Sequence, residues 1–415
     1  MSLNSTKSIQ VAILITGSEF SLGLKQDTNS KMIADYLRPF GLEISQITLA
    51  PDDQQIITST LQQLANKNQL ILVSGGLGPT QDDLTRFALA DLTKTSLIQD
   101  DATTQHIQEL FAKRGRSMSE SNKLQALFPD GATIIPNPIG TAAGFLVNHQ
   151  NCEIICLPGV PRELSAMLTQ TVIPKIQSKF KLNLDLETRV IRLLGLPESK
   201  VGEMIVELKI PSAISVCYQA SFPEIQVILS GNNRSLLDEV FKQTTETITS
   251  ERIFSNSLEL SLEKTVHLEL LTSKKTLTLA ESCTGGAISA LVVSNPDSSQ
   301  YYLGGINCYS NSAKNRFLDI PYELINEFDA VSPEVAKAMA EGMRANLDSD
   351  LALSITGYAG PSGTTNNPAG TYYIGITDRS NQTSITKHFF VGERSAFQRY
   401  ASYTALHILL NYLRN

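Results

Sequence analysis

The sequence predicts an α/β protein with three parts: an N-terminal domain around a parallel sheet, a small α+β connector and a C-terminal α/β domain. Near the N-terminus, apolar runs such as 9–16 and 70–73 alternate with segments of helical periodicity. This order gives a parallel sheet with right-handed crossovers. A similar alternation begins again near residue 259, after a stretch of different character. A chain of 415 residues is long enough for about three domains, and we expect them at 1–172, 173–255 and 256–415.

The N-terminal elements follow from residue patterns in chain order. The β-branched run 9–16 is typical of a strand buried on both faces. Asn29 and Ser30 can cap a helix over 31–38, whose apolar residues share one side. The other expected strands are 42–49, 70–73, 132–135 and 152–157, and the other expected helices are 52–65, 82–92, 102–114, 119–127 and 161–180.

The connector mixes strands and helices in an α+β pattern, and the segment 250–260 is a plausible boundary. After that boundary the α/β pattern returns. The strands expected in these two parts are 187–193, 224–230, 276–280, 304–309, 351–356 and 371–377, and the helices are 198–207, 234–248, 259–272 and 287–293.

One C-terminal helix has clear start signals. Ser332 can act as its N-cap, and Pro333 suits its first position, so the helix is expected over 333–347. Four of its residues recur at every fourth position and are interpreted as core contacts: Val335, Met339, Met343 and Leu347.

Composition argues against several classes of partner. The formal net charge is −7, from 34 Lys and Arg against 41 Asp and Glu, so the chain has no broadly basic footprint for nucleic acid. No stretch of about 20 apolar residues is present, as a membrane span would require. The N-terminus does not read as a signal peptide, and the five cysteines fit reduced, mostly buried thiols. We therefore expect a cytoplasmic protein.

A glycine-rich loop, SGGLGPTQDD over 74–83, follows the third predicted strand. Glycines expose backbone N–H groups and let a ligand approach closely, and the helix that follows adds partial positive charge. The carboxyl end of a parallel strand is also where open α/β sheets bind ligands. The loop therefore predicts a phosphate site.

The two carboxylates at the end of this loop admit two interpretations. Thr80 and Asp83 fit a Thr-x-x-Asp capping box, which would explain Asp83 without any function. Two carboxylates beside a phosphate site also suit a hard divalent cation, most simply Mg²⁺. Both interpretations stay open for Asp83, whereas the functional role is favoured for Asp82.

Two further glycine-bearing loops follow strands, NPIGTAAG over 137–144 and LPGVPRE over 157–163. With the loop 74–83 they resemble the molybdopterin-binding domain family, in the version found in the CinA family. The resemblance implies a phosphate-bearing nucleotide or pterin ligand and, in CinA-type proteins, a metal-dependent ADP-ribose pyrophosphatase. The positions implied for nucleotide or phosphate binding are Gly75, Gly76, Gly78, Thr80, Asp82, Asp83, Gly140 and Thr141, with Asp82 and Asp83 also as ligands of a divalent cation such as Mg²⁺.

The loop after the first strand departs from that family's pattern. Glu19, Asp27 and Asn29 are present, but Ser18 stands where the family has an acid. If that acid helps to hold the metal, this chain lacks one of the metal's ligands.

A second polar turn, AESCTGG over 280–286, follows the strand 276–280. A substrate phosphate or carbonyl oxygen can be held there, near a helix N-terminus, with Ser282 and Thr284 as hydroxyl donors. Thr284 can equally be a helix cap. Cys283 is a weak candidate nucleophile, because no histidine motif accompanies it.

A serine activated by a lysine or a tyrosine is the remaining common solution for amide hydrolysis. Lys314 can act as a base only if burial or neighbouring positive charge lowers its pKa; otherwise it is a solvated surface lysine. Thr356 precedes another glycine-rich loop. Arg394 offers a fork for phosphate, or forms a surface ion pair.

The segments AESCTGG, CYSNSAK, AVSPEVA, SITGYAGP, PAGT and GER resemble, in order, the CinA C-terminal domain. The resemblance implies an amidohydrolase that converts nicotinamide mononucleotide to nicotinate mononucleotide and ammonia, in pyridine-nucleotide recycling, without a cofactor. It implies Ser299 as the nucleophile, with Ser298 as the alternative, and Tyr309 and Lys314 as the groups that activate it. The residues implied for substrate binding are Ser282, Thr284, Gly285, Thr356, Gly357 and Arg394.

Two other functions stay open. The N-terminal domain can be the main enzyme, cleaving ADP-ribose, or the protein can be a regulatory module that binds nucleotides without catalysis. By analogy with proteins of this shape we expect a homodimer. Its expected ligands are small-molecule nucleotides, and neither nucleic acid nor a membrane is expected as a partner.

Overall fold

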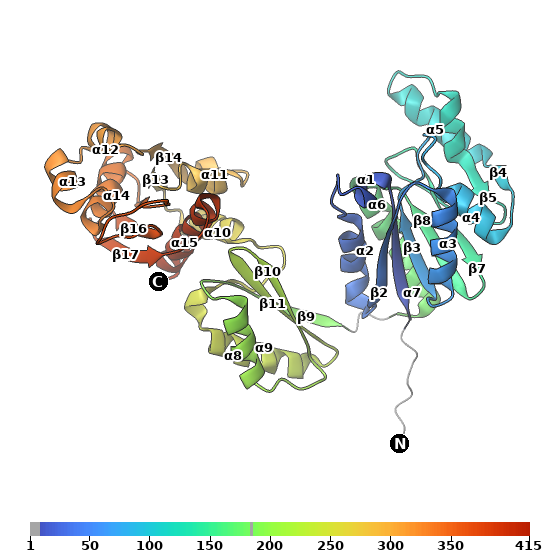
Figure 1. Ribbon diagram of the computed structural model, residues 1–415, viewed down its shortest axis with the longest axis horizontal. Coiled ribbons are helices and arrows are strands. Elements are labelled where there is room, and N and C mark those ends of the chain that lie inside the picture. Colours follow the sequence, from blue (N-terminus) through green and yellow to red (C-terminus); the bar gives the residue numbers. More distant parts are fainter. Residues whose placement is uncertain (1–8, 183–185) are drawn as a thin grey trace. The chain divides into compact units, whose positions relative to one another are not determined.

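The computed structural model describes residues 9–182 and 186–415. The chain forms two compact units, Met1–Glu187 and Thr188–Asn415 (Figure 1). Both contain sheets with helices packed on them, so the predicted α/β class is confirmed.

The sheet of the first unit has the strand order β2-β1-β3-β8-β7-β6. Strands β1, β2, β3 and β8 are parallel, as predicted, but β7 runs antiparallel to β8 and β6 runs antiparallel to β7. A separate antiparallel pair is formed by β4 and β5. The strands are β1 Val11–Thr16, β2 Ile44–Ala50, β3 Leu70–Ser74, β4 Leu97–Gln99, β5 Leu127–Pro129, β6 Thr133–Ile135, β7 Gly144–His149 and β8 Cys152–Leu157.

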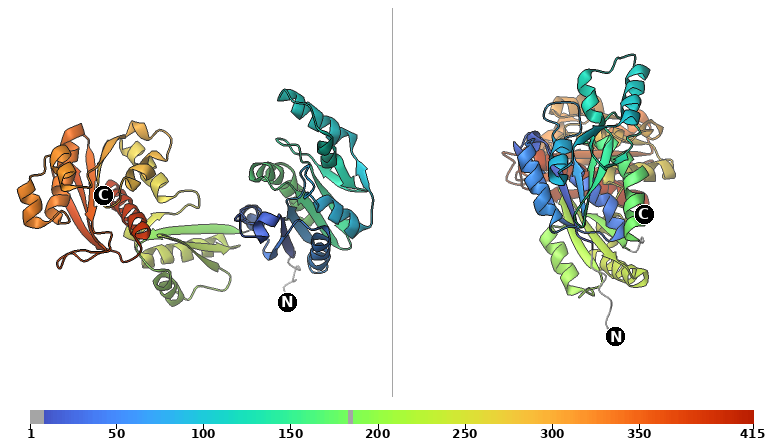
Figure 2. Two further views of the ribbon diagram at one scale, coloured as in Figure 1. Left: turned by 45° about the horizontal axis from the view of Figure 1, so that its top comes forward. Right: turned by 90° about the vertical axis from the view of Figure 1, so that its right-hand side faces the viewer.

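Helices cover both faces of this sheet (Figures 1 and 2). Alternate residues of the central strands pack into two apolar cores, one with α3 and α4 and the other with α2, α6 and α7, as expected for strands buried on both faces. The helices are α1 Ser18–Ser21, α2 Asn29–Leu37, η1 Arg38–Phe40, α3 Gln54–Ala65, α4 Thr85–Thr93, α5 Asp101–Lys113, η2 Glu120–Ala126, α6 Pro161–Met167, η3 Leu168–Val172 and α7 Ile173–Phe180.

The boundary of the first unit lies later than the sequence suggested. Ile176 of α7 is buried in the same core as Val172 and the strands of the N-terminal sheet. Because α7 completes that core, the expected boundary after residue 172 moves to residue 187.

The second unit begins with a small sheet of order β10-β11-β9-β12, whose core is closed by α8 and α9. Leu194 and Phe254 of this connector are buried in the core of the C-terminal domain. The connector therefore shares a core with the C-terminal domain, and the expected boundary at 255/256 does not separate two bodies. Its elements are β9 Glu187–Leu194, α8 Glu198–Glu207, β10 Ser215–Ser221, β11 Glu224–Gly231, α9 Arg234–Ile248, η4 Ser250–Arg252 and β12 Ile253–Ser255.

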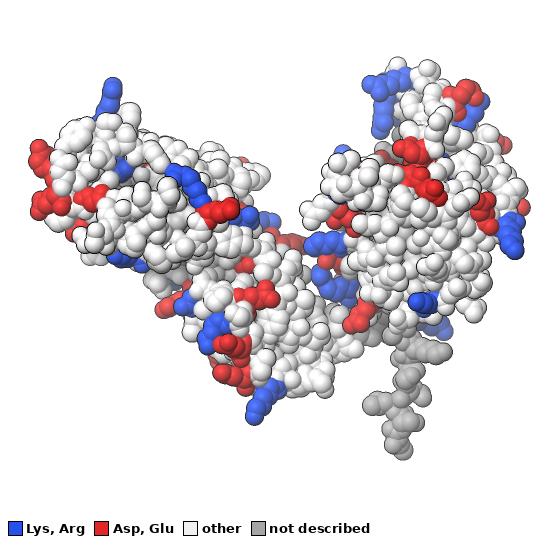
Figure 3. All heavy atoms as spheres, viewed as in Figure 1, with Lys and Arg blue, Asp and Glu red and all other residues white. Residues whose placement is uncertain are grey.

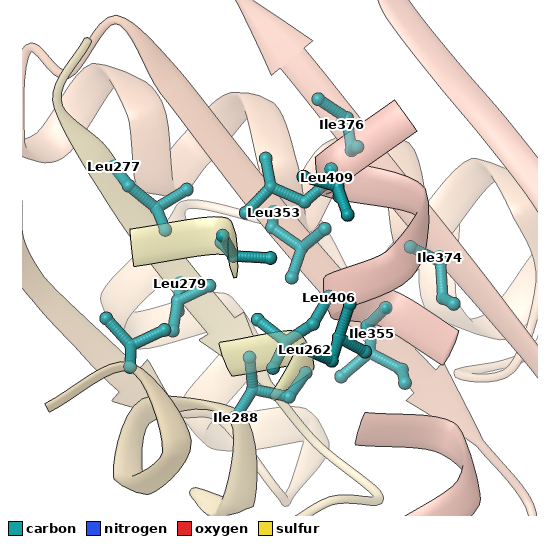
Figure 4. Packing of buried hydrophobic residues seen from close by; sticks show 14 of the residues in the cluster. Leu262, Leu277, Leu279, Ile288, Leu353, Ile355, Ile374, Ile376, Leu406 and Leu409 are labelled. Carbon is teal, nitrogen blue, oxygen red and sulfur yellow. The ribbon is translucent and has the colours of Figure 1, made fainter. Parts of the chain in front are cut away.

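The C-terminal sheet has the order β14-β13-β15-β16-β17, with β14, β13 and β15 parallel and the last two strands antiparallel. One face packs on α10, α11 and α15 (Figure 4), and the other packs on α12, α13 and α14. The elements are α10 Leu262–Ser273, β13 Leu277–Glu281, α11 Ala287–Val293, η5 Ser298–Gln300, β14 Tyr302–Asn307, α12 Asn311–Leu318, α13 Tyr322–Phe328, α14 Pro333–Leu347, β15 Leu351–Gly357, β16 Thr371–Asp378, β17 Thr383–Phe389 and α15 Arg394–Arg414.

The structure corrects two local predictions. Helix α14 begins as predicted, with the Ser332 hydroxyl accepting the N–H of Val335, but Leu347 at its last turn is 44% exposed instead of lying in the core. The cap of α2 is also not the predicted one. The carboxylate of Asp27 accepts the N–H groups of Asn29 and Ser30, which frees the Asn29 side chain for contacts with other loops.

Surface properties agree with the composition. Figure 3 shows Lys and Arg side chains scattered among acidic and uncharged side chains on the visible face. Cysteine burial follows the expectation for four of the five thiols, since only Cys217 is exposed. Within residues 9–182 and 186–415, none of the helices combines the length and apolar character that crossing a bilayer requires.

The pH dependence of stability tests the packing of His407, which is buried in α15 against the Phe254 ring. Burial, with Arg414 and Arg252 nearby, lowers its pKa from 6.5 to about 4. Between these pH values the unfolded chain binds a proton that the folded chain does not. The folded state should therefore lose stability as the pH falls from 6.5 to 4, by up to about 3 kcal/mol from this group.

Urea unfolding of the second unit, followed by circular dichroism at pH 7 and pH 4.5, measures this loss. We expect His407→Leu to lose less stability than wild type over that interval, while the exposed His106→Leu keeps the wild-type pH dependence. Equal pH dependence in His407→Leu and wild type would show that this imidazole does not contribute.

Candidate functional site

The carboxyl ends of β1, β3 and β8 line a cavity of about 500 Å³ in the first unit. The glycine-rich loop 74–83 forms one wall, and the loops that follow β1 and β8 form others. This is the sheet edge at which open α/β sheets bind ligands. The predicted residues that line the cavity are Gly75, Gly76, Gly78, Thr80, Asp82, Asp83 and Thr141.

Gly140, the remaining predicted residue, does not line the cavity. It lies behind Glu163, which does. Its N–H donates to the Asn137 side-chain oxygen at 2.9 Å, and the Asn137 amide donates to Glu163 at 2.6 Å. A Cβ at position 140 would collide with the Glu163 carboxylate, which itself lines the cavity. Gly140 therefore lies outside the cavity lining, and its lack of a side chain leaves room for the Glu163 carboxylate.

The loop 74–83 turns directly onto the end of β1. Gly75 and Gly76 have φ angles of 116° and 66°, which side chains other than glycine rarely adopt. A Cβ on Gly75 would collide with the carbonyl of Thr16, and one on Gly76 would collide with the hydroxyl of Thr85. These two positions require glycine because the backbone passes so close to its neighbours.

Asn29 joins two walls of the cavity. Its side-chain N–H₂ group donates to Ser74 Oγ at 3.0 Å and to the carbonyl of Gly159 at 2.8 Å. The loop after β3 is thereby tied to the loop after β8. This explains Asn29 by a contact far away in sequence, which the capping interpretation did not foresee.

Asp83 closes the loop from inside. One carboxylate oxygen accepts the N–H of Gly78 at 2.7 Å, and the other accepts the N–H of Thr80 at 2.8 Å and the Thr80 hydroxyl. The structure thus supports the capping interpretation of Asp83, although α4 begins only at Thr85. A ligand anion would use the same N–H groups.

Arg86, which the sequence did not single out, supports the loop from below. Its side chain is buried, and its guanidinium donates to the carbonyls of Leu77 at 2.7 Å and Gly78 at 3.1 Å. Burial lowers its pKa to about 10, although Asp83 opposes this shift. An arginine on the apolar side of the helix predicted over 82–92 was the signal that could have revealed it.

The residues of this cavity do not form a centre for the implied divalent cation. Asp83 is occupied by its own loop, and Glu19 lies 3.6 Å from the ammonium of Lys25. Asp82 is exposed. In the described part of the chain, no three His, Cys, Asp or Glu side chains are grouped as metal ligands would be.

Ser18, at the position where the resemblance implies an acid, pairs with a carboxylate. The Ser18 N–H donates to Asp52 Oδ2 at 2.7 Å, and the Ser18 hydroxyl accepts the N–H of Asp52 at 3.0 Å. An acid at position 18 would place a second negative charge beside Asp52, where a cation would be needed to offset the repulsion. In this chain a hydroxyl takes that place.

Variants of the two adjacent aspartates separate their roles. Asp83→Ala leaves three loop donors without an acceptor, so we expect the first unit to lose about 1–3 kcal/mol of unfolding free energy. Asp82→Ala removes an exposed carboxylate and should change stability by less than about 0.5 kcal/mol. Chemical denaturation followed by circular dichroism measures both values. Equal losses in the two variants would contradict the assignment of Asp83 to the loop.

In the second unit, Lys314 is buried at the carboxyl end of the sheet, with only 1% of its surface exposed. It lies on α12, whose N-cap Ser310 accepts the N–H of Ala313. Its Nζ is 3.1 Å from Ser282 Oγ, 2.8 Å from the carbonyl of Cys308 and 3.4 Å from that of Tyr309. Lys314 is therefore not the surface lysine of the simpler interpretation.

The surroundings of this amine favour its neutral form. Burial lowers the pKa of Lys314, and the nearby thiols of Cys308 and Cys283 oppose the shift only in part. The three acceptors around Nζ are two carbonyl oxygens and a hydroxyl, and none of them carries a charge. If the two carbonyls take the two hydrogens of a neutral amine, its lone pair is left for the Ser282 hydroxyl.

Glu281 holds the turn that carries Ser282, and the residue patterns did not single it out. One carboxylate oxygen accepts the Thr284 hydroxyl and the N–H groups of Gly286 and Ile288, and the other accepts the N–H and hydroxyl of Ser289. Glu281 is buried and serves as the cap of α11, in place of Thr284. An acid between a buried strand and a glycine turn was the available signal.

Because Glu281 caps α11, it occupies the N–H groups at which the sequence predicted a substrate phosphate. The N–H groups of Gly286, Ile288 and Ser289 already have a carboxylate partner. The expectation that a substrate phosphate binds at this helix N-terminus is therefore not met. Thr284 is buried, and Gly285 is exposed beside the Gln398 side chain.

Ser299 does not lie beside Lys314. It lies in η5, before the amino end of β14, and it is exposed. The carbonyls that hold Lys314 Nζ follow the carboxyl end of β14. The six residues of β14 span roughly 20 Å at about 3.3 Å per residue. Within one chain, Lys314 therefore meets Ser282 and neither Ser298 nor Ser299.

Tyr309 and Arg394 form the exposed rim of this site. The Arg394 guanidinium donates to the Tyr309 hydroxyl at 2.7 Å and to the carbonyl of Gly360 at 3.2 Å. Tyr309 is 61% exposed, and its own carbonyl contacts Lys314. Arg394 is thus not engaged in the surface ion pair that was its simpler interpretation.

Thr356 and Gly357 end β15, directly beside the turn of Ser282. The Ser282 N–H donates to the carbonyl of Ile355 at 3.1 Å. Thr356 is buried, and its hydroxyl donates to the carbonyl of Ala330 at 2.7 Å. The structure therefore brings Ser282, Lys314, Tyr309, Thr356 and Arg394 to one edge of the sheet.

Cys283 is not suited to act as a nucleophile. Its side chain is buried in the apolar core, and burial raises the pKa of its thiol to about 12. The thiolate is the reactive form of cysteine, so this residue stays unreactive near neutral pH.

Two family models match the chain. The model of a probable molybdopterin binding domain covers residues 12–178, and the model of the CinA C-terminal domain covers residues 259–413. The fold and the two glycine-bearing sheet edges thus define a protein that joins a molybdopterin-binding-like domain to a CinA C-terminal domain.

Whole-chain relatives identify the family. The chain is 37% identical to a CinA-like protein of Citrifermentans bemidjiense over 98% of both chains, and 36% identical to one of Geotalea uraniireducens over 96% of both. A solved competence or damage-inducible protein from Enterobacter asburiae matches at 31% identity, with a TM-score of 0.36, over 37% of this chain and 96% of its own. On the strength of the whole-chain relatives, the chain belongs to the CinA family.

Proposed function

We propose that the C-terminal domain hydrolyses the carboxamide of nicotinamide mononucleotide, giving nicotinate mononucleotide and ammonia. The observation that carries this proposal is the buried contact of 3.1 Å between Lys314 Nζ and Ser282 Oγ. Amide hydrolysis needs a nucleophile, a base and an oxyanion stabiliser, and this pair supplies the first two. The choice of substrate follows from the resemblance to the CinA C-terminal domain.

The reaction proceeds through an ester on Ser282. Its Oγ attacks the carboxamide carbon while the neutral amine of Lys314 accepts the hydroxyl proton. When the C–N bond breaks, Lys314 returns that proton to the leaving nitrogen, and ammonia departs. Water, deprotonated by the same amine, then attacks the ester and releases the nicotinate carboxylate and the Ser282 hydroxyl.

Backbone groups of the turn supply the oxyanion stabiliser in this scheme. Cys283 and Thr284 directly follow the proposed nucleophile, and among the described residues neither backbone N–H donates to another residue's carbonyl. N–H groups placed in this way stabilise the negative oxygen that forms when a nucleophile attacks an amide.

The nucleotide's phosphate is assigned to Arg394. Glu281 occupies the N–H groups at the start of α11, whereas Arg394 is exposed and its guanidinium donates, within the described part of the chain, to Gly360 and Tyr309 only. A guanidinium has five N–H donors in a fork that matches phosphate. Tyr309, bonded to Arg394, would lie between the phosphate and the buried pair.

Ammonia release from nicotinamide mononucleotide tests the nucleophile. Ser282→Ala removes the attacking oxygen, so we expect the rate to fall by at least about 10³-fold. Ser299→Ala, at the opposite edge of the sheet, should retain activity within about twofold of wild type. Full activity in Ser282→Ala, with loss in Ser299→Ala, would assign the nucleophile to Ser299 and overturn this mechanism.

Lys314 variants test the base in the same assay. Lys314→Met keeps the apolar stem and should lose about 10²–10⁴-fold. Lys314→Arg should lose a similar factor, because a guanidinium does not release its proton. In wild type, kcat should rise with pH as Lys314 loses its proton and level off below 10.5, the ordinary lysine pKa. Activity in Lys314→Met would exclude this residue as the base.

As a second function, we propose that the N-terminal cavity binds a phosphate-bearing nucleotide such as ADP-ribose. The cavity of about 500 Å³ at the carboxyl ends of β1, β3 and β8 supports this proposal, and so does the resemblance to the molybdopterin-binding domain family. Binding without turnover is the expected behaviour, because the described residues do not group as metal ligands.

Calorimetric titration with ADP-ribose, with and without Mg²⁺, tests the second function. Arg86→Met removes the donors that hold the Leu77 and Gly78 carbonyls, so we expect binding to weaken about tenfold or more. Asp82→Ala, a substitution in the loop that Arg86 contacts, serves as the control variant for Arg86→Met. Mg²⁺-dependent cleavage of ADP-ribose into AMP and ribose 5-phosphate that Asp82→Ala abolishes would establish a pyrophosphatase, and absence of binding would remove the proposal.

The proposal also covers the cellular location of the protein and its oligomeric state. We place the reaction in the cytoplasm, which suits free thiols; the chain's five cysteines are all unpaired. The homodimer expected from the sequence stays a prediction.

A further inference from the structure

An aromatic side chain at the tip of the connector's β10–β11 hairpin reaches the C-terminal domain. The ring centroid of Phe222 lies 5.7 Å from that of Phe390 and 6.1 Å from that of Tyr400. Phe390 and Tyr400 themselves stack at 4.4 Å, with their planes 16° apart. Aromatic pairs attract one another at these separations, so the three rings form one cluster.

The helix that carries Tyr400 also carries two side chains of the proposed site. Arg394 begins α15 and bonds the Tyr309 hydroxyl. One turn further, the Gln398 side chain donates to the carbonyl of Cys283 at 3.1 Å. The first turns of α15 therefore touch both the exposed rim and the turn that carries the proposed nucleophile.

Phe390 fixes the segment that leads into this helix. Its N–H donates to the carbonyl of Gly370 at 2.9 Å, and a Cβ on Gly392 would meet the Phe390 ring. The Gly370 N–H in turn donates to the carbonyl of Tyr358, at the start of the loop after β15. The ring cluster therefore stabilises the segment that leads into α15. Through the backbone bonds of Gly370, it is also linked to the loop after β15.

We propose that Phe222 is a positioning residue for the amidohydrolase site. By packing on Phe390 and Tyr400, the connector hairpin fixes the start of α15 and with it the guanidinium of Arg394. This inference rests on the proposed function. Ser282 and Lys314 are held by groups at the ends of β13, β14 and β15, and α15 hydrogen-bonds to their turn only through the Cys283 carbonyl among the described residues, so Phe222 acts chiefly on substrate binding.

Steady-state kinetics with nicotinamide mononucleotide measures this division. Phe222→Ala should raise KM about two- to tenfold, the factor that corresponds to the loss of one aromatic contact, while kcat stays within about twofold. Phe222→Tyr keeps a ring and should restore the wild-type KM. Val206→Ala, an exposed truncation on α8 of the same connector, serves as the control and should match wild type.

A binding measurement gives a readout apart from turnover. The chain contains no tryptophan, so Phe222→Trp places a single tryptophan in the ring cluster, and its fluorescence can be excited apart from that of tyrosine. In the Ser282→Ala background, which binds without reacting, its emission should change on addition of nicotinamide mononucleotide. The Kd of Phe222→Ala in that background should rise by the same factor as KM.

The outcomes separate the two proposals. Wild-type turnover with an unchanged KM and Kd in Phe222→Ala overturns the positioning role and leaves the proposed function intact. A fall in kcat without a change in KM also overturns it, because the chemical step would then depend on the hairpin. Wild-type protein that neither binds nor hydrolyses nicotinamide mononucleotide overturns both.

Discussion

Among the described residues, the buried amine of Lys314 has no charged partner, and the arrangement of the C-terminal sheet edge depends on this constraint. An unpaired buried charge is strongly unfavourable, so the environment favours a neutral amine whose contacts are two carbonyls and the Ser282 hydroxyl. Strand β14 ends just before the two residues whose carbonyls contact the amine, and β13 ends one residue before the serine. Glu281 then stabilises the turn without pairing with the lysine.

The two units share one local arrangement at the carboxyl end of a central strand. In each, a glycine-bearing turn follows a central parallel strand, and a carboxylate of the protein itself accepts the turn's N–H groups: Asp83 in the first unit and Glu281 in the second. A glycine-rich turn at a strand's carboxyl end is therefore not by itself a phosphate site. The two turns differ in the buried basic side chain that contacts them. Arg86 donates to a carbonyl of the first turn, and Lys314 contacts the Ser282 hydroxyl of the second.

The sequence was sufficient for the parallel strands and most helices, because long apolar runs and capping signals are local. It did not reveal β10 and β17, which lie at sheet edges, contain no fully buried residue and carry no apolar run. Family resemblance implied Ser299, yet strand direction favours Ser282, since Ser299 precedes a strand and Ser282 follows one. The residue patterns did not identify Glu281 and Arg86, because the roles of these two residues depend on contacts across a turn that such patterns do not specify.

The carboxylate of Asp83 is tethered three to five residues from the N–H groups that it occupies. It behaves as a competitor held at high effective concentration. If the cavity binds a nucleotide as proposed, a small anion such as inorganic phosphate would gain little beyond those N–H groups and would be disfavoured. A larger molecule that also fills the rest of the cavity would have further contacts with which to displace the side chain, so the loop would discriminate by ligand size before it discriminates by charge.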